Sequence, residues 1–421
     1  MLLVVLLASV VGVYVLDARQ RASQEASPPS VEEEALEPLT VLIGVACSTD
    51  SGLNGTEEMV RLAQGDINAY CEERGSRFRF EFLVESCSGR SAVALNVTKT
   101  FKASGIDFIV GHGWSSLCDA SLEYVNENDI LLLSPSSSSP KLCIPDDNLF
   151  RLAPPDSTQG PVIVKMLKSY GIEAVVVMQR GDEWADCIYA TFEPSYQALG
   201  GVIIHRIRYG PEDTEFSDHL EEAESHIQEA FAEYGKEHVA LQVISFAEAM
   251  PTLLQAQDYP TLMNVTWFGT EGTVDFRMIA DDAGEQASKV GLIGPVASPS
   301  YSYANLDLKE IGKRFGFYQT WEYFHLATGY DCCWIYALSV LEASSPSALE
   351  VKAVLPGVAA DYSGASGPCV LDENGDRLIV NYALRGYAET SPGMYGFHQY
   401  GFYNATTDTI SWSELVESLP H

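Results

Sequence analysis

The stretch from Ile106 to Pro140 constrains the fold more than any other part of this chain. Its residue pattern predicts, in order, a strand, a turn, a helix, a second strand and a second turn. Ile106–Gly111 and Asp129–Ser134 are apolar runs of the length typical of strands buried on both faces, and Leu117–Glu127 between them has helical spacing. The first predicted strand is followed by glycine and serines, and the second by a run of four serines. Ligands bind just beyond the carboxyl ends of strands in an open parallel sheet, so these two turns predict one wall of a small-molecule site.

The same alternation of strand and helix extends from this stretch in both directions. Before it, the predicted elements are Thr40–Cys47, Thr56–Arg74, Phe78–Glu85 and Arg90–Ala103. After the Pro154-Pro155 break, a second series is predicted at Gln159–Tyr170, Ala174–Gln179, Cys187–Leu199, Gly201–Arg208, Ser217–Tyr234, Val239–Ile244, Pro251–Gln257 and Thr266–Gly269. This order predicts an α/β fold with two doubly wound parallel sheets.

The last third of the chain contains further predicted elements, and we expect it to return from the second sheet to the first. Its elements are a strand at Gly291–Ala297, a long helix at Phe315–Ala343, a short helix at Ser347–Leu355, a hairpin turning at Asn374-Gly375, and aromatic edge strands after Gly393. We therefore predict two lobes joined by three hinge crossovers. The predicted segments are residues 1–19 as signal or membrane anchor, 20–38 as tether, 39–154 plus 297–380 as the first lobe, and 155–296 plus 381–421 as the second.

Charge and the N-terminal segment indicate where the protein works. A net charge of −33 at pH 7 argues against nucleic acid and anionic membrane surfaces as partners. Met1–Leu16 has the apolar character of a signal peptide core, but no basic residues precede it, so an uncleaved anchor is an alternative. Gln20–Pro38 is rich in Ser, Pro and Glu and indicates a flexible tether. We expect an exported protein that is either secreted or anchored to the outer face of the membrane. The apolar N-terminal segment is the only part expected to contact the membrane.

Cysteines and glycosylation sequons also favour export. The chain has nine cysteines, and none of them are spaced like zinc ligands, so we expect disulfides rather than a metal site. Asn-x-Ser/Thr sequons occur at Asn54, Asn96, Asn264 and Asn404.

Signatures of catalysis, metals and cofactors are missing from the sequence. Gly113–Leu117 lacks the final glycine of a nucleophile elbow, and no HExxH or phosphate-loop pattern occurs. Asp372–Asp376 resembles half of a calcium loop without its closing glutamate, and a plain Asn-Gly turn is the alternative. Four histidines match no metal-ligand spacing and are expected to be solvated: His205, His219, His226 and His238. We therefore predict no enzyme activity, no metal and no cofactor.

Several segments, taken in order, carry a family resemblance. They are IGVACSTDSG, AQGDINAY, GHGWSS, SPSSSSPKL, FRLAPPDSTQGPVIVKML, WFGTEG, TGYDCCWIYAL and SGPCVLDENGDR. From about Val41 to Asn404 the chain resembles the type I periplasmic binding proteins, specifically the branched-chain amino-acid-binding proteins of ABC importers. The same fold forms the ligand-binding region of natriuretic-peptide and metabotropic glutamate receptors. The resemblance implies two lobes that close on a ligand held in the cleft.

The resemblance places a ligand carboxylate and ammonium against hydroxyls of the first lobe. Ser115 falls at the family's serine after the third strand, and Ser136 and Ser138 at its hydroxyl residues after the fourth. Hydroxyls and backbone N–H groups at helix N-termini suit a carboxylate. The alternative is that these serines are helix caps and turn residues.

The second lobe is expected to supply a lid and an acid. Trp184 matches an aromatic that covers the ligand, with ordinary packing as the alternative, and Phe246 is expected to add apolar contact. Glu271 matches the carboxylate that pairs with the ligand ammonium, with a solvated loop glutamate as the alternative. In the first lobe, Trp114 is expected to narrow the cleft and Asp50 to border it.

The resemblance also implies a disulfide and a function. Cys87 and Cys118 match a disulfide of the receptor members, and Cys187 is expected to be a free thiol. We expect a solute-binding protein that captures an amino acid or related small amino compound for an ABC permease of the branched-chain amino-acid type. The alternative is a ligand-sensing ectodomain of the receptor type, without a transport role.

Overall fold

The computed structural model of the chain describes residues 37–419, except 275, 300–302 and 317–320. The chain divides into two units, Met1–Leu39 and Thr40–His421, and the elements described below belong to the second unit apart from the first residue of the first strand. The predicted leader of residues 1–19 lies outside the described residues, as does the predicted tether of residues 20–38 except for its last two. Among the helices of the described ranges, none is both long enough and apolar enough to span a membrane.

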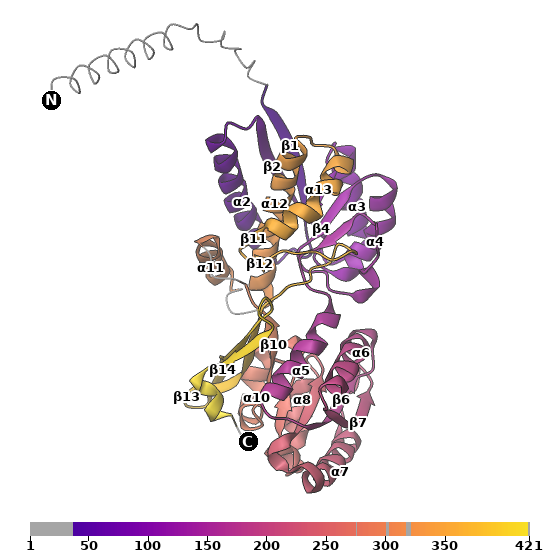
Figure 1. The fold of residues 1–421 in the computed structure, drawn as a ribbon, viewed down its shortest axis with the longest axis vertical. Coiled ribbons are helices and arrows are strands. Elements are labelled where there is room, and N and C mark those ends of the chain that lie inside the picture. The colour runs from indigo at the N-terminus through magenta and orange to yellow at the C-terminus, as the bar shows by residue number, and fades with distance from the viewer. Residues whose placement is uncertain (1–36, 275, 300–302, 317–320, 420–421) are drawn as a thin grey trace, which may run out of the picture. The chain divides into compact units, whose positions relative to one another are not determined.

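The first sheet is built from five strands that come early in the sequence (Figure 1). They are β1 (Leu39–Cys47), β2 (Phe78–Ser86), β3 (Phe108–Val110), β4 (Leu131–Ser134) and β5 (Leu149–Arg151). Their spatial order is β2-β1-β3-β4-β5, and β1, β3, β4 and β5 pair in parallel. Every residue of β3 and β4 is buried, as expected for strands covered on both faces.

Helices from two distant parts of the chain cover this sheet. They are α2 (Leu53–Glu73), α3 (Ser91–Ala103), α4 (Ser115–Glu127), α11 (Tyr303–Phe315), α12 (Trp321–Ala343) and α13 (Ala348–Asp361). Helix α3 packs against α4, while α12 packs against α2, α11 and α13. Tyr336 ties α12 to the sheet, because its hydroxyl donates to the carbonyl oxygen of Leu131 at 2.7 Å. We call the first sheet with these helices the first lobe.

The second sheet has eight strands. They are β6 (Ala174–Arg180), β7 (Val202–Tyr209), β8 (Val239–Ile244), β9 (Thr266–Phe268), β10 (Ile293–Ala297), β13 (Tyr382–Ser391), β14 (Met394–Asn404) and β15 (Thr409–Trp412). The block β7-β6-β8-β9-β10 is parallel, and β13, β14 and β15 continue it in antiparallel order. The two-lobed α/β architecture is therefore confirmed, with a second sheet that is mixed rather than wholly parallel.

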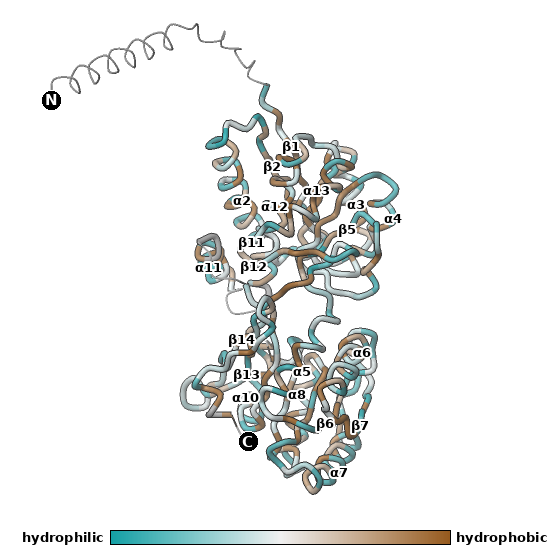
Figure 2. The backbone as a smooth tube through the Cα atoms, viewed as in Figure 1, coloured by the Kyte–Doolittle hydropathy of each residue, from teal (hydrophilic) through white to brown (hydrophobic). Residues whose placement is uncertain are grey.

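Helices lie on both faces of the second sheet, and alternate residues of β6 show why. The helices are α5 (Gln159–Ser169), α6 (Glu183–Ala198), α7 (Ser217–Tyr234), α8 (Ala249–Gln255), α9 (Glu271–Val274) and α10 (Arg277–Lys289). Val175 and Val177 join a core with α5 and α6, whereas Val176 and Met178 join a core with α7, α8 and α10. Successive strand residues point to opposite faces of the sheet, so the apolar residues of this one strand pack into two separate cores. Figure 2 shows hydrophobic chain along the strands and hydrophilic segments on outer helices and loops. We call the second sheet with these helices the second lobe.

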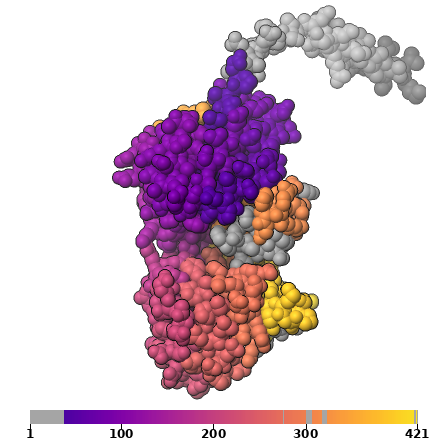
Figure 3. Space-filling model, turned by 180° about the vertical axis from the view of Figure 1, so that it is seen from behind, coloured from indigo at the N-terminus to yellow at the C-terminus, as the bar shows by residue number. Residues whose placement is uncertain are grey.

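The chain crosses between the lobes after β5, after β10 and before β13, which places its last strands on the second lobe. In Figure 3 the yellow C-terminal residues lie against the second lobe, where β13 and β14 pack on α10.

Two predicted elements differ in the structure. The predicted long helix Phe315–Ala343 corresponds to α12, which begins later, at Trp321, and α11, which ends at Phe315, was not predicted. The predicted hairpin at Asn374-Gly375 is a turn, in which Gly375 has φ +76° and a lone bridge joins Leu371 to Arg377. The strand pair near it, β11 (Ser363–Gly364) with β12 (Gly367–Pro368), precedes that turn.

Candidate functional site

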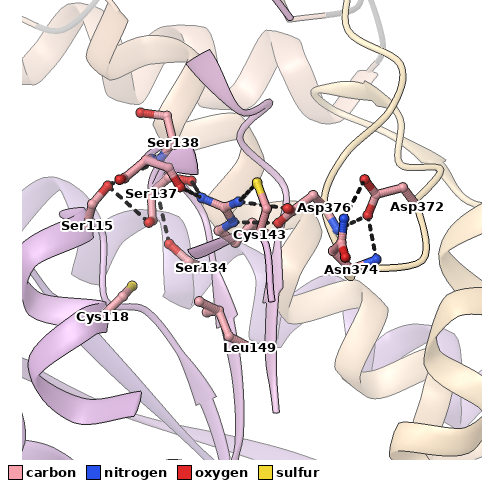
Figure 4. A network of polar contacts seen from close by, with 12 residues as sticks. Ser115, Cys118, Ser134, Ser137, Ser138, Cys143, Leu149, Asp372, Asn374 and Asp376 are labelled. Carbon is pink, nitrogen blue, oxygen red and sulfur yellow. Dashed lines mark hydrogen bonds and ion pairs between the residues drawn. The ribbon is translucent and has the colours of Figure 1, made fainter. Parts of the chain in front are cut away.

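The loop after β4 is held by Ser115, the first residue of α4 (Figure 4). The Ser115 Oγ accepts hydrogen bonds from the backbone N–H groups of Ser138 at 3.3 Å and Ser139 at 3.2 Å, and from the Ser137 hydroxyl at 3.2 Å. Ser115 is thus engaged within the loop and does not line either of the two cavities described below.

A second contact joins the turn after β3 to the same loop. The Ser136 hydroxyl donates to the carbonyl oxygen of Gly113 at 2.8 Å. A Cβ atom at Gly113 would lie 2.8 Å from the Ser136 Oγ, so only glycine permits this approach. The two small-residue turns read from the sequence are therefore neighbours, as the parallel sheet requires.

A buried ion pair fixes the far side of this loop. Arg151, on β5, donates from Nε to Asp376 Oδ1 at 2.5 Å and from Nη2 to Oδ2 at 2.7 Å, and both side chains are fully buried. Its Nη1 donates to the carbonyl oxygen of Ser139 at 2.7 Å. Asp376 closes the turn that begins at Asp372, whose Oδ1 accepts from the Asp376 N–H at 2.9 Å. The loop after β4, residues 135–139, is called the serine loop below. It is thereby anchored to the turn Asp372–Asp376 of the first lobe (Figure 4).

A cavity of about 370 Å³ is lined by residues of both lobes. The first lobe contributes the β4 loop and α12, and the second lobe contributes the starts of α5, α6, α9 and β13 and the end of β10. Among its lining residues are five that the sequence proposed for the ligand: Ser136, Ser138, Trp184, Phe246 and Glu271. A volume of this size suits a small organic molecule.

One wall of this cavity is aromatic. The rings of Trp184 and Phe246 are stacked, with centroids 4.0 Å apart and planes inclined by 26°. Trp184 lies in the first turn of α6, where Asp182 caps the helix by accepting from the Ala185 N–H at 3.1 Å. Arg180 lies over Phe246, 4.8 Å from its centroid, and is paired with Glu248. Trp184 therefore sits on a capped helix end that fixes its position.

Two carboxyl groups face the cavity. Glu271, at the start of α9, accepts a hydrogen bond from Gln159 Nε2 at 3.0 Å. Asp156 is 5% exposed, and burial raises its pKa to about 7, although hydrogen bonds from Ser138 and Trp184 act in the opposite direction. Asp156, Gln159 and Tyr382 were missed at the sequence level, although Asp156 and Gln159 lie in FRLAPPDSTQG, just after the Pro154-Pro155 break.

A second cavity of about 340 Å³ lies against the first lobe and shares Ser136 and His325 with the first. Trp114 lines this second cavity, not the first, and is 42% exposed. Asp50 lines neither, although its neighbours Thr49 and Ser51 line the second. The Asp50 carboxylate instead accepts hydrogen bonds from Ser86 at 2.5 Å and Ser88 at 2.9 Å, which hold its pKa below the usual value.

The expected Cys87–Cys118 disulfide is wrong for this structure, and so is the broader expectation of disulfides. All nine cysteines lie among the described residues and all are free thiols, Cys187 included. The physical reason lies in His112: the Cys87 Sγ contacts His112 Nδ1 at 3.2 Å, while the Cys118 Sγ donates to the His112 carbonyl oxygen at 3.1 Å. Each sulfur is thus turned to a different group of His112, and burial raises the pKa of Cys87 to about 12 and of Cys118 to about 11.

Comparison with solved structures shows the fold. The branched-chain amino acid transporter substrate binding protein LivJ of Streptococcus pneumoniae, solved in complex with isoleucine, matches with a TM-score of 0.63 and 20% identity over 86% of this chain and 99% of that chain. An ABC transporter substrate-binding protein from Sphaerobacter thermophilus matches with a TM-score of 0.68 and 16% identity over 88% of this chain and 99% of that chain.

Sequence comparison also finds relatives of this chain. An uncharacterized protein of Methanocaldococcus jannaschii is 25% identical over 394 residues, which are 88% of this chain and 91% of that protein. The Leu/Ile/Val-binding protein of Escherichia coli is 28% identical over 124 residues, which are 29% of this chain and 32% of that protein.

The family follows from a match that spans most of the chain. The sequence model of the receptor family ligand binding region matches residues 56–390, from the first turn of α2 to the penultimate residue of β13. The resemblance noted in the sequence to type I periplasmic binding proteins is confirmed together with it. The chain therefore belongs to the receptor family ligand binding region.

Proposed function

We propose that this protein captures an amino acid or a related small amino compound by closing its two lobes on it, without chemistry on the ligand. The observation that carries the proposal is the cavity of about 370 Å³, to which both lobes contribute polar and aromatic side chains. The crossovers between the lobes are single-chain connections, which suits closure about a hinge. Membership in a family of ligand-binding regions supports binding rather than catalysis.

We further propose that the protein acts outside the cytoplasm and delivers its ligand to an ABC permease of the branched-chain amino-acid type. Substrate-binding proteins of ABC transporters share its fold, and one of them was solved with isoleucine. The net charge of −33 suits a solvated exterior and disfavours anionic membrane surfaces, which leaves the N-terminal segment as the proposed point of attachment.

The binding step is tested by calorimetric titration of a panel of amino acids and amines, joined to solution scattering of the free and saturated protein. Binding with a smaller radius of gyration is expected for the true ligand. Saturable binding without compaction would rule out closure, and a panel without any binder would rule out the proposed ligand class.

Glu271→Gln is expected to weaken binding of the identified amino compound by about tenfold or more, because an ammonium in a closed cleft needs an opposite charge. Glu350→Gln is the matched control, since Glu350 lies exposed in the first turn of α13 and outside the cavity. Equal affinity of the two variants would remove Glu271 from the site.

A sensory role is the second candidate, and the family description of a receptor ligand-binding region favours it. In that case ligand would change self-association of the first lobe rather than docking to a permease. Sedimentation of the protein with and without ligand separates the two, because a ligand-dependent monomer–dimer shift is expected only of the sensor.

A further inference from the structure

The cavity between the lobes is acidic. Asp156 and Glu271 line it, and among the described residues no lysine or arginine does. His325 also lines it, but burial lowers the pKa of its imidazole to about 3, so it carries no charge at neutral pH. The nearby guanidinium of Arg151 is committed to Asp376. Above pH 7, where Asp156 is ionised as well as Glu271, the groups that line this cavity therefore repel an anion and attract a cation.

Several hydrogen-bond donors that an anionic ligand would need are already engaged. The Gln159 amide donates to Glu271 at 3.0 Å and the Ser136 hydroxyl to the Gly113 carbonyl at 2.8 Å. The hydroxyls of Tyr382 and Thr158 are hydrogen-bonded to each other at 2.8 Å. Backbone N–H groups of the serine loop are engaged as well, since those of Ser138 and Ser139 donate to Ser115. A ligand carboxylate would have to take a donor from a buried acceptor, and leaving a buried acceptor unpaired is unfavourable.

The aromatic side chains of the cavity also favour a cationic ligand. Within the part of the chain that the structure describes, five aromatic side chains line the cavity: Trp184, Phe246, Phe276, Phe324 and Tyr382. Ring faces attract cations, and sites that recognise alkylated ammonium groups combine several such faces. A cavity with many rings, two acids and engaged donors suits an organic cation better than a zwitterion.

We propose that the ligand is an organic cation with apolar substituents and without a free carboxylate, such as an alkyl amine, a quaternary ammonium compound or an amino-acid amide. This rests on the proposed function and narrows its ligand class. It also gives Ser115, Ser136 and Ser138 a loop-fixing role, in place of contact with a ligand carboxylate.

Matched ligand pairs test this, because the members of a pair differ chiefly in the carboxylate. Calorimetric titrations at pH 8 would compare leucine with leucinamide, lysine with cadaverine, and glycine betaine with choline. In the pair that fits, the member without a carboxylate is expected to bind at least about tenfold more tightly. Tighter binding of the zwitterion would overturn the inference and leave solute capture intact. Absence of binding by all six would contradict both.

Variants of the two acids supply the second arm. Asp156→Asn and Glu271→Gln are each expected to weaken the best cationic probe by about tenfold, with the folded state checked by circular dichroism. Glu350→Gln is expected to leave affinity unchanged, because Glu350 is exposed on α13. Unchanged affinity in both acid variants would overturn the inference even if a cation binds.

A separate cluster on the second lobe carries an independent inference. His205 on β7 lies beside Glu222 and His226, which are four residues apart on α7, and one ligand atom of each lies within 4.8 Å of the others. His205 Nε2 is 2.8 Å from Glu222 Oε1, and the two imidazole rings stack with centroids 4.2 Å apart. Sequence spacing showed no metal signature because one ligand comes from a strand and two come from a helix.

We infer that these three side chains form a binding site for a divalent transition metal of the Zn²⁺, Ni²⁺ or Cu²⁺ type. Two imidazoles and a carboxylate are the ligands such ions take, and open positions are left for water. Asp218 and Glu221 line the same surface hollow as Glu222 and His226, so the local field favours a cation. A bound ion would fasten α7 to β7.

Titration of tag-free protein with Zn²⁺, followed by calorimetry, tests the cluster. The His205→Asn/His226→Asn double variant is expected to lose at least about tenfold in affinity, and His238→Asn, at a partly exposed histidine outside the cluster, is expected to lose none. Co²⁺ is expected to give a visible absorption band in the parent protein that the double variant lacks. Equal Zn²⁺ affinity in parent and double variant would overturn this inference.

Discussion

At the scale of single residues, the pair formed by Arg151 and Asp376 joins stability to the site. Both side chains are buried and make two hydrogen bonds, and Arg151 also holds the Ser139 carbonyl. Asp376→Asn keeps the shape and leaves the Arg151 charge buried without a counter-charge. We expect a loss of about 3–5 kcal/mol in the free energy of unfolding, measured by urea denaturation.

The control for this prediction is an exposed ion pair of similar type. Arg277 and Asp281 approach to 3.3 Å with side chains 77% and 55% exposed. Asp281→Asn is expected to change the free energy of unfolding by less than about 1 kcal/mol, since water screens the pair. A comparable loss in both variants would show that burial of the Arg151 pair does not set its contribution.

Asp156 predicts a pH dependence of stability. Burial raises its pKa from 3.8 to about 7, so the folded protein holds this proton more tightly than the unfolded chain does. Ionisation therefore costs stability as the pH rises from about 4 to about 7, and the cost is constant above that range. Asp156→Asn removes it, so the variant is expected to gain stability relative to the parent across this range. At about 1.4 kcal/mol per pKa unit the gain amounts to several kcal/mol.

Urea denaturation of both proteins between pH 4 and pH 9 measures this gain. Taking the difference between variant and parent cancels the titration of all other groups. A difference that stays flat from pH 4 to pH 7 would show that Asp156 ionises normally in the fold.

The clustering of the candidate site residues was partly predictable from the sequence. Five of the eight proposed ligand residues line one cavity, because strand ends and helix starts set where the turns lie. Ser115, Trp114 and Asp50 do not line it. Which side chains of a turn face inward depends on contacts between distant segments, such as the hydrogen bonds of Ser138 and Ser139 to Ser115, and no local pattern encodes them.

At the scale of elements, α12 is the helix of the first lobe that packs against α2, α11 and α13. It is buried around most of its circumference, as expected for a helix that is hydrophobic on all sides. Tyr336 fastens it to β4 through the Leu131 carbonyl at 2.7 Å, and its ring is 5.5 Å from that of Phe108 on β3. Tyr336→Phe keeps the ring and removes the hydrogen bond, so we expect a loss of about 1–3 kcal/mol in the free energy of unfolding.

Tyr259→Phe is the matched change at a partly buried tyrosine whose hydroxyl makes an exposed hydrogen bond. The Tyr259 hydroxyl donates to the Ser217 carbonyl at 2.9 Å, where water can replace it. Its loss is expected to shift the free energy of unfolding by no more than about 0.5 kcal/mol. Thermal or urea unfolding of both variants decides whether the contact of α12 with β4 contributes more than a surface hydrogen bond.

Elements with strong patterns were predicted to within a few residues, and those without were missed. Helix α7 was predicted with the bounds that the structure has, because its apolar residues recur at helical spacing. Helix α10 was missed, since RMIADDAGEQASK buries mainly alanine, glycine and one isoleucine. The Asn374-Gly375 turn was predicted as a hairpin. The residues beside it do not pair as strands, because Asp376 binds Arg151 and its N–H donates to Asp372.

At the scale of the whole molecule, the net charge of −33 predicts that salt stabilises the fold. Raising NaCl from about 0.01 M to about 1 M shortens the screening length from about 30 Å to about 3 Å and weakens self-repulsion. The thermal midpoint is expected to rise by several degrees. Repeating the comparison near pH 4.4, the isoelectric point, is the control, since the rise is expected to vanish there. An equal rise at both pH values would point to a cause other than charge.

The second lobe has a consequence for biosynthesis. Its parallel block ends at β10, and the strand that pairs with the free side of β10 is β13, made some eighty residues later. A ribosome would release the whole first sheet early, while β10 waits with an open edge until β13, β14 and β15 emerge. An unpaired edge of this kind is prone to join other chains, so nascent protein stalled before Tyr382 is the species most in need of a chaperone.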